Sequence, residues 1–563
     1  MRLVAVGAML AALGCTPKWK QTPHDRVFQR APVAKTHLMP AKNMTTSDWW
    51  DYALLAGVVP LGKLVSPARY LKYALGGRVA LDINRFGNVP DSPWFENRIG
   101  RRPLTPEQMR RGQNRNPGPA PGPLTIISGK LEGATPGLVL RDSKKVVWFV
   151  KFDPPAHPEL SSGAEVIASR LLWAAGYHVP EIHIVQLSLT RLALAPNAKR
   201  RDDYNRRRPL READLKLLIT QLNPSSRGVV RALFSRSVPG RELGPFFYRG
   251  TRKDDPNDRI PHQRRRSLRG LKVFSSWINN TDTRAKNTLD TFVARPGKRL
   301  GHVRHYLIDF GDALGAAGNR EKYVGESHSY RVDWVEMAKG MFALGLYYPK
   351  WLRVRRSPFR SVGMFNSKQF TPGRWHPGYP NVAFDELTPL DRFWAAAIIA
   401  RFTPAGIRAA VATAQYRAKG AGEWIERVLL ERRRKLLVHA FAKMEALDRP
   451  KIVNRYVLEL ADLKQLAGIT TAKGKFAWAA RWNRTGRPDH PMAEGIADGP
   501  RIDLRLPLRK LMLKDKNAFV ADPFITVKVW RLDRGKRGPR VDVHVRAAYD
   551  YLIPVGLHRE VVQ

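Results

Sequence analysis

Residues 277–290 read WINNTDTRAKNTLD, and residues 305–315 read HYLIDFGDALG. An apolar run ending at Ile278 leads into a polar loop that contains Asp282 and Asn287. A predicted strand follows, and the next extended stretch delivers Asp309 shortly before a glycine. Two carboxylates and an amide, carried on a loop and at a strand end, are suitable ligands for a magnesium ion, which can in turn bind a phosphate. These two stretches decide how the rest of the chain is interpreted.

The stretch VVWFVKF (146–152) is a predicted strand in which Lys151 shares a face with Val147 and Phe149. An ammonium on such a face needs an anionic partner. Glu165 is the candidate, because it lies in the next predicted helix, SSGAEVIASRLLWAAG. A second interpretation is open, because Ser162 and Glu165 also match the helix capping box S-x-x-E, in which the Glu only accepts a backbone hydrogen bond.

The pattern of apolar residues predicts an α+β fold in several parts. LTIIS, LVLRD, VVWFVKF, one helix and EIHIVQLSL predict a small sheet crossed by a helix. Further helices are predicted over residues 211–235, 265–280, 333–346 and 389–446, and a hairpin over 288–293 and 303–308. RIDLRLPL, FITVKVWRL and RVDVHVRAAY alternate with period two near the C-terminus, which predicts a small β unit.

The N-terminal stretch MRLVAVGAMLAALGC resembles a bacterial lipoprotein signal, with one Arg, an apolar run and a small residue before Cys15. Cys15 is the only cysteine, so an internal disulfide is impossible and a lipid thioether is its natural use. We expect a lipid-anchored, periplasm-facing protein of the cell envelope. A signal without lipid, or a later start codon and a cytoplasmic protein, are the alternatives. No later stretch has the apolar length of a membrane span.

The 563-residue chain has 97 Lys and Arg against 49 Asp and Glu, a formal net charge of +48. Its length predicts several folding units. The charge favours an anionic surface such as lipid, lipopolysaccharide or nucleic acid, although a coding bias towards Arg gives the same composition. No zinc-finger spacing, RNA-binding signature or recognition helix is found, so no specific nucleic acid is predicted.

The chain from about residue 124 to 446 resembles the protein-kinase-like superfamily in its atypical branches, similar to HipA-type and CotH-type kinases and to phosphoinositide kinases. The resemblance is carried by D-x4-N in TDTRAKN, which lacks a preceding His-Arg, and by DFG in HYLIDFG. The chain also resembles a bacterial lipoprotein family of unassigned function, through DDPNDRIPHQRRRSLRGL (254–271), NTLD, HYLIDFG and WHPGYPNVAF. The resemblance implies a bilobal fold, with a small β-rich lobe and a helical lobe.

The kinase resemblance also implies ATP and Mg²⁺ as cofactors and a hydroxyl-bearing acceptor. It implies Lys151 as phosphate anchor with Glu165 as its brace, Asp282 as catalytic base, and Asn287 and Asp309 as magnesium ligands. Arg284 stands where many kinases have a Lys, and its charge would neutralise the γ-phosphate.

The chain departs from the kinase pattern in two places: the glycine-rich stretch that would cover the phosphates, and the residues just before Asp282. Gly129, Gly133 and Gly137 are not spaced as G-x-G-x-x-G, and residues 279–281 are Asn-Asn-Thr. A lipoprotein is exported to a compartment that is expected to be poor in ATP. Two kinds of function are therefore carried forward: an atypical kinase or nucleotidyltransferase, and a catalytically inactive kinase-like lipoprotein that acts as an envelope adaptor.

The acidic stretch around Asp254, Asp255, Asp258 and His262 admits a second metal or substrate site, or pairing with Arg264–Arg266. His302 and His305 are expected to be structural. The predicted organisation is a signal (1–15), a linker (16–45), a mostly helical segment (46–115), a kinase-like N-lobe (116–235), a helical C-lobe (236–450) and a β-rich domain (451–563).

Overall fold

The structure is a computed structural model. It describes residues 39–40, 79–130, 136–201, 207–222, 224–297, 300–329, 334–344, 346–347, 356–471, 474–484, 488–514, 523–548 and 551–562. These ranges leave out the predicted signal with Cys15, the linker except residues 39–40, residues 46–78 of the segment predicted to be mostly helical, and Gly133.

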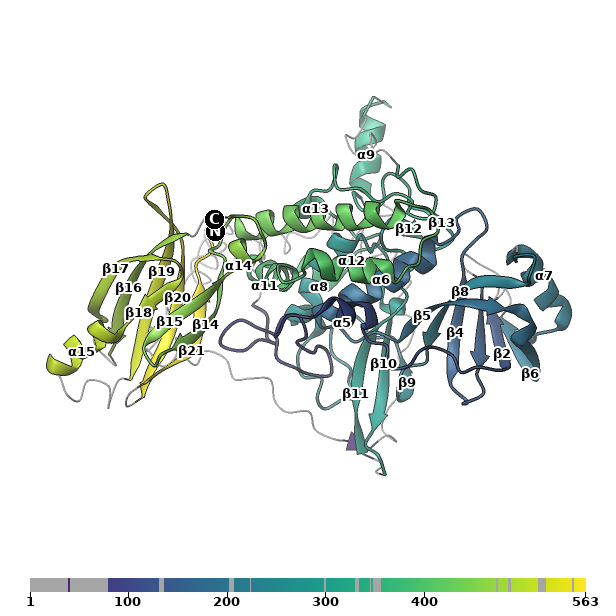
Figure 1. The fold of residues 1–563 in the computed structure, drawn as a ribbon, viewed down its shortest axis with the longest axis horizontal. Coiled ribbons are helices and arrows are strands. Elements are labelled where there is room, and N and C mark those ends of the chain that lie inside the picture. Colours follow the sequence, from purple (N-terminus) through teal and green to yellow (C-terminus); the bar gives the residue numbers. More distant parts are fainter. Residues whose placement is uncertain are drawn as a thin grey trace, which may run out of the picture.

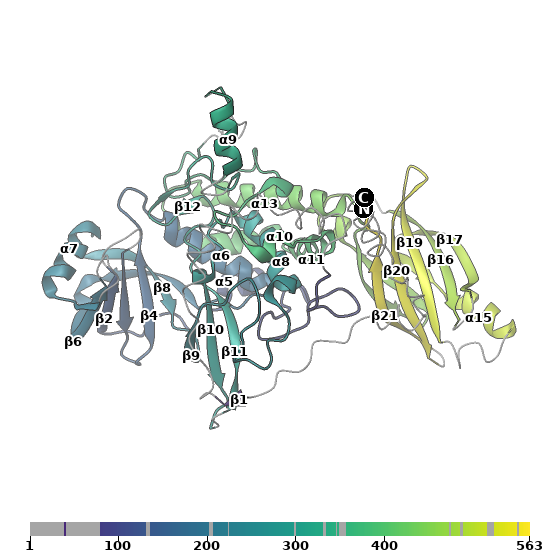
Figure 2. The same ribbon diagram turned by 180° about the vertical axis from the view of Figure 1, so that it is seen from behind.

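The chain has a mixed α+β fold with several sheets, which confirms the predicted class. Figure 1 shows a sheet at each end of the molecule and a helical region between them, and Figure 2 shows the same order from behind. The largest apolar clusters follow this order: one in each end sheet and one through the helices.

The seven-stranded sheet has the order β5-β8-β4-β3-β2-β6-β7. Its strands are β2 (Leu124–Lys130), β3 (Gly137–Arg141), β4 (Val147–Phe152), β5 (Ile182–Ser188), β6 (Leu192–Arg201), β7 (Arg207–Pro209) and β8 (Val229–Arg236). Trp148, Val150 and Phe152 of β4 are buried in the sheet's own core, so Lys151 lies on the opposite, less buried face.

The prediction of a helix over residues 211–235 is wrong for the second half of that range. Helix α7 (Glu212–Leu222) ends before a turn at Gly228, which has a φ of 65°. The next residues, VVRALFSR, form β8 and pair with both β4 and β5. Pairing on both edges overrides the helical tendency of Arg, Ala and Leu.

The middle of the molecule is built from helices and a long hairpin. The helices are α5 (Pro106–Arg111), α6 (Leu160–Ala175), α8 (Arg266–Ile278), α9 (Trp334–Phe342), α10 (Val382–Asp385), α11 (Pro389–Ile399), α12 (Pro404–Ala412) and α13 (Ala421–Phe441). The predicted hairpin is confirmed as β10 (Thr288–Ala294) and β11 (Leu300–Leu307), which form a four-stranded sheet with β9 (Arg241–Gly244) and β1 (Met39–Pro40).

Within the described residues, none of the helices alone has the length and apolar character to cross a membrane. Only α11 and α12 pass that test as a pair, and they are bent by 78°.

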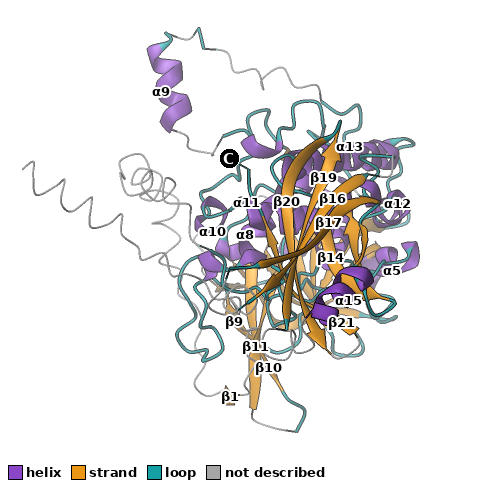
Figure 3. Ribbon diagram, turned by 90° about the vertical axis from the view of Figure 1, so that its left-hand side faces the viewer, coloured by secondary structure: helices purple, strands orange, loops and turns teal. Residues whose placement is uncertain are grey.

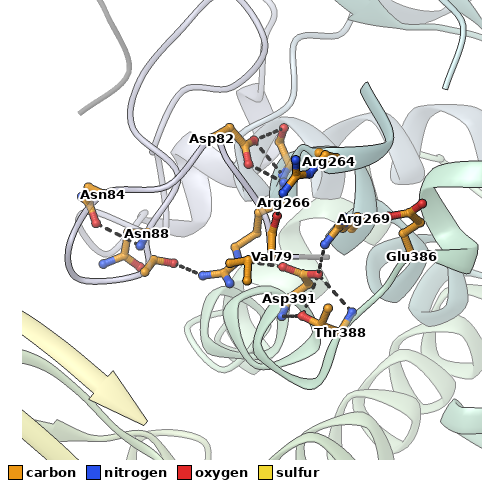
Figure 4. Close-up of polar contacts among 12 residues, drawn as sticks. Val79, Asp82, Asn84, Asn88, Arg264, Arg266, Arg269, Glu386, Thr388 and Asp391 are labelled. Atoms are coloured by element: carbon orange, nitrogen blue, oxygen red, sulfur yellow. Dashed lines mark hydrogen bonds and ion pairs between the residues drawn. The ribbon is translucent and has the colours of Figure 1, made fainter. Parts of the chain in front are cut away.

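A buried polar network ties α8 to α11 and to the loop that begins at residue 79 (Figure 4). Asp391 accepts hydrogen bonds from Arg266 Nε at 2.8 Å and from Arg269 Nη1 at 3.3 Å. Asp82 accepts from the Ser267 hydroxyl at 2.8 Å, and Arg266 also donates to the Gly87 carbonyl. These arginines are buried, so each needs its carboxylate partner.

The C-terminal part is β-rich, as predicted. One sheet contains β14 (Leu447–Val453), β15 (Val457–Asp462) and β18 (Arg501–Asp503). The other has the order β17-β16-β19-β20-β21, with β16 (Lys475–Asn483), β17 (His490–Asp498), β19 (Phe524–Asp533), β20 (Lys536–Ala548) and β21 (Tyr551–Arg559). Figure 3, viewed from this end, shows the five-stranded sheet in front of the helices.

The strand predicted over 501–508 ends at Asp503. The Asp503 carboxylate accepts a 3.0 Å hydrogen bond from the backbone N–H of Arg505, where helix α15 (Arg505–Lys514) begins. An Asp side chain that accepts the backbone N–H two residues later forms an Asx turn, and this local contact competes with the strand that the alternating pattern predicts.

Candidate functional site

A cleft of about 540 Å³ is lined by residues of β2, β3 and β4 on one side, and by residues 282–287 and 309–312 on the other. Five of the predicted site residues line it: Lys151, Asp282, Arg284, Asn287 and Asp309. They come from three separate segments of the chain. The fold therefore brings together side chains that the sequence singled out one by one.

Lys151 lies between two carboxylates. Its Nζ donates to Glu165 Oε2 at 2.9 Å and to Asp309 Oδ1 at 2.7 Å. Burial alone would lower the pKa of Lys151, but the two carboxylates raise it, so the ammonium stays charged. The predicted partnership of Lys151 and Glu165 is thus present in the structure.

Glu165 does not serve as a helix cap, so the capping-box interpretation is wrong. Helix α6 begins at Leu160, which places Ser162 inside its first turn. Asp153 instead accepts the backbone N–H of Ser162 at 2.8 Å and also its hydroxyl. The Glu165 side chain is 3% exposed. Burial, opposed by Lys151 and reinforced by the charge of Asp309, raises the pKa of Glu165 to about 7.

Asp309 has a positive φ of 57°, in a region that Asp and Asn adopt more readily than other side chains. Its side chain is 51% exposed. Burial of the site opposes ionisation, but the Lys151 ammonium and the Gly311 N–H lower the pKa of Asp309. A Cβ at Gly311 would lie 2.7 Å from Ser161 Oγ, so glycine permits the close approach of this turn to α6.

The loop before Asp282 is buried and held from several sides. Asn279 ends α8 with a φ of 53°, and its side-chain oxygen accepts from the Trp375 indole at 3.1 Å. The Thr281 hydroxyl accepts from Lys322 Nζ at 2.6 Å, and its carbonyl accepts from the Gly378 N–H at 2.8 Å. The Asn-Asn-Thr sequence, which departs from the kinase pattern, thus makes the contacts that fix this loop.

Asp282 forms a bidentate ion pair with the guanidinium of Arg284, which also lies over the Tyr379 ring at 4.6 Å. Asn287 donates its side-chain N–H to the Asp282 carbonyl at 2.8 Å, so its side-chain oxygen Oδ1 is the atom that could serve as a metal ligand. The Ile308 N–H donates to the Asn287 carbonyl at 3.0 Å. That bond holds Asn287 next to the residue that precedes Asp309.

Four polar cleft residues were missed by the sequence reasoning: Ser128, Ser161, Lys286 and Asp312. Lys286 directly precedes Asn287, and Asp312 directly follows the Asp-Phe-Gly motif, so position in a motif was a usable signal for both. Ser161 carried no such signal, because only the fold brings the first turn of α6 to the cleft.

The donor set fits magnesium together with a phosphate. Among the described residues, no group of three or more His, Cys, Asp or Glu side chains is placed to hold a metal ion. Magnesium, however, is usually held by one or two carboxylates, waters and phosphate oxygens, so Asn287 and Asp309 suffice with a phosphate ligand. Lys151, which lines the same cleft, would supply the cation for the phosphate itself. No protein-family model, curated protein or solved structure matches the chain.

Within the described part of the chain, the acidic stretch after residue 253 is held in ion pairs and is not grouped as a metal-ligating cluster. Asp258 Oδ2 lies 2.6 Å from His262 Nε2, and Asp258 Oδ1 accepts from Arg265 at 2.7 Å. Asp254 pairs with Arg252 at 2.9 Å. The acids are therefore paired with arginines, as one of the two interpretations predicted. Of Arg264, Arg265 and Arg266, Arg265 is the one seen to pair with them.

His305 has structural partners, as expected. Its Nδ1 lies 2.7 Å from Asp290 Oδ1, and its ring stacks on Trp94 with 3.5 Å between centroids. His305, Asp290 and Trp94 are all buried, so this histidine of β11 packs the hairpin against Trp94.

Proposed function

We propose that the chain is an atypical, metal-dependent kinase-like phosphotransferase that moves a phosphate from a nucleotide such as ATP to a hydroxyl acceptor. In this proposal the seven-stranded sheet and the helical region are the two lobes of a kinase-like fold. The observation that carries the proposal is the meeting of Lys151, Asp282, Asn287 and Asp309 in one cleft, with Glu165 bound to Lys151.

The proposed reaction needs little covalent chemistry from the protein. Magnesium, when bound, would neutralise charge on the phosphate oxygens. Lys151 would exchange Asp309 for a phosphate oxygen while Glu165 keeps its ammonium in place. The acceptor oxygen would form the new bond to phosphorus and lose its proton to Asp282. The bond to the leaving nucleoside diphosphate breaks, and the diphosphate keeps the electron pair.

Arg284 would have to release Asp282 before the carboxylate could act as a base. The guanidinium would then be available for the γ-phosphate, in agreement with the charge that many kinases place there. Its contact with Tyr379 gives it an anchor from which it could move between these two anions.

The same ion pair favours a second candidate function. The Asp282 carboxylate is occupied by two charge-assisted hydrogen bonds from Arg284, which an acceptor hydroxyl would have to displace. A chain that kept this pair in the presence of ligand would bind nucleotide and metal without transfer. It would then act as a kinase-like adaptor rather than as an enzyme.

Thermal-shift titration of the chain with ATP, with and without Mg²⁺ or Mn²⁺, tests the proposal. Ligand at 100 times its Kd stabilises the folded state by about 2.7 kcal/mol, which is a measurable rise in Tm. We expect a rise that needs both nucleotide and metal. Absence of a shift on folded protein would reject the kinase-like proposal, and a shift without transfer to any tested hydroxyl acceptor would favour the adaptor.

We also infer a lipid-anchored envelope location, from the signal-like N-terminus and the single Cys15. Mass spectrometry of the mature N-terminus tests it. An acylated Cys15 would support the location, and an intact N-terminus at Met1 would contradict it.

A further inference from the structure

Helix α9 and the turn after it expose a cluster of large apolar side chains. Met337, Met341, Phe342, Leu344 and Leu346 are 53%, 75%, 88%, 89% and 88% exposed, and Tyr347 is 38% exposed. We call these six residues the α9 tip. Side chains this exposed lose the stabilisation that burial would give them, and they are concentrated within a segment of eleven positions, 337–347.

Backbone hydrogen bonds link residues of the α9 tip to one another. The Ala343 N–H donates to the Lys339 carbonyl at 3.0 Å, and the Leu346 N–H donates to the Ala343 carbonyl at 2.8 Å. Leu344, just after the helix, has a φ of 46°. Lys339 Nζ lies 5.8 Å from the ring centroid of Tyr347, so this ring lies beside α9.

The tip also stands away from the rest of the molecule. Figures 1, 2 and 3 all show α9 projecting from the helical region, on a side that neither end sheet covers. Met337 and Met341 are four positions apart and therefore share one face of the helix. These exposed apolar side chains are therefore among the first atoms to touch another surface that approaches the molecule from this side.

We propose that the α9 tip inserts into the surface of an anionic lipid bilayer. A bilayer accepts a small projecting apolar element, because its acyl chains need no matching shape. The net charge of +48 favours an anionic surface over a neutral one, and Lys339, exposed beside the tip, can reach the headgroups. This inference is independent of the phosphotransferase proposal and of the lipid on Cys15.

A second copy of the chain is a poorer occupant. Stable protein interfaces involve about 20 to 30 residues on each side, whereas the α9 tip offers six. Two such tips in contact would also bring two strongly basic chains together, and their charges oppose that contact.

The test is vesicle co-sedimentation of the chain that starts at residue 15, with Cys15→Ser so that it has no lipid. Vesicles of phosphatidylcholine alone are compared with vesicles of equal phosphatidylglycerol and phosphatidylcholine. We expect binding to the anionic vesicles that weakens with added salt. The double substitution Met341→Glu and Phe342→Glu should lower the partition coefficient about tenfold or more, because two inserted side chains are lost.

Leu217→Glu is the matched control, because Leu217 is 63% exposed on α7, away from the tip. It should leave vesicle binding unchanged, and both variants should keep the parent Tm. Equal loss in both variants, or no loss in the double variant, would overturn the proposal. So would sedimentation that shows a dimer which the double substitution abolishes, since the tip would then be an interface between copies.

Discussion

Lys151 on β4 and Asp309 after β11 are 158 positions apart in the chain and are joined by a 2.7 Å ion pair. The same ammonium binds Glu165 at 2.9 Å, so one cation serves two carboxylates. The three side chains together carry an excess negative charge whenever Glu165 is ionised. A site with this balance favours a further cation, and a nucleotide with its metal would bring one while giving Lys151 a phosphate in exchange.

Asp309→Asn tests the proposed metal ligand. We expect loss of the metal-dependent nucleotide shift, because a neutral amide replaces the ligand charge. The fold should change little, since the side chain is half exposed and Asn tolerates the positive φ of this position. Calorimetric titration measures the binding. Asp498→Asn, at a side chain that is 84% exposed, is the control, and unchanged binding in Asp309→Asn would mean that this residue is not a ligand.

Asp282→Asn separates binding from transfer. If Asp282 is the base, phosphate transfer should fall by a factor of about 10² to 10⁴, while the nucleotide-dependent rise in Tm is retained. The measurement is transfer from labelled nucleotide, followed with a thermal-shift titration of the same preparation. Transfer at the parent rate would remove Asp282 from the mechanism. Parent protein that binds nucleotide but transfers nothing would favour the adaptor.

The Lys151–Glu165 pair should be strongly coupled in a double-mutant cycle. Lys151→Met leaves a nearly buried Glu165 without its cation, and we expect a loss of about 3 to 5 kcal/mol in the free energy of unfolding. Lys151→Met with Glu165→Leu should lose much less than the sum of the single changes. Urea unfolding gives these values. The exposed pair of Lys451 and Glu459 is the control, with coupling below about 1 kcal/mol, and similar coupling in both pairs would contradict the prediction.

Glu165 should also make stability depend on pH. Its pKa rises from 4.5 to about 7 on folding, so between these values the folded chain holds a proton that the unfolded chain has released. The stability that folding gains from holding this proton is fully present below pH 4.5 and is lost as the pH rises to 7. Asp309 changes the stability in the opposite direction with pH. Its pKa is lowered from 3.8, however, so it titrates below the range from pH 4.5 to pH 7.

Glu165→Gln removes this titration. The difference in unfolding free energy between the parent chain and the variant should change by up to about 3 kcal/mol between pH 4.5 and pH 7.5, with the parent losing relative stability at the higher pH. Urea unfolding at both pH values measures it. An identical difference at the two pH values would show that Glu165 does not titrate in this range.

The sequence predicted much of the cleft because its residues lie in short motifs. Asp282, Asn287 and Asp309 are fixed by spacing next to strands, and Lys151 by the alternation of β4. What it could not predict depends on contacts between distant segments. VVRALFSR became β8 because two strands flank it, and Asp282 acquired Arg284 as a partner through the fold of the loop. Secondary-structure patterns also do not say that the α9 tip would remain uncovered.

The pairing of Asp391 with Arg266 and Arg269 is the clearest long-range contact of this kind, and it yields a final prediction (Figure 4). Asp391 is fully buried, and its charge compensates Arg266, whose guanidinium also donates to the Gly87 carbonyl. Asp391→Asn keeps the size of the side chain and an oxygen that can cap α11 at Thr388, but it removes the charge.

We expect Asp391→Asn to cost about 3 to 5 kcal/mol in the free energy of unfolding, because a buried guanidinium is left without its carboxylate. Asp503→Asn removes the exposed partner of Arg505 and should cost less than about 1 kcal/mol. Urea unfolding of both variants makes the comparison. Equal losses would mean that the buried network contributes no more than a surface pair. Because α8 carries Arg266 and ends at the loop that contains Asp282, weakened nucleotide binding in Asp391→Asn would link this network to the cleft.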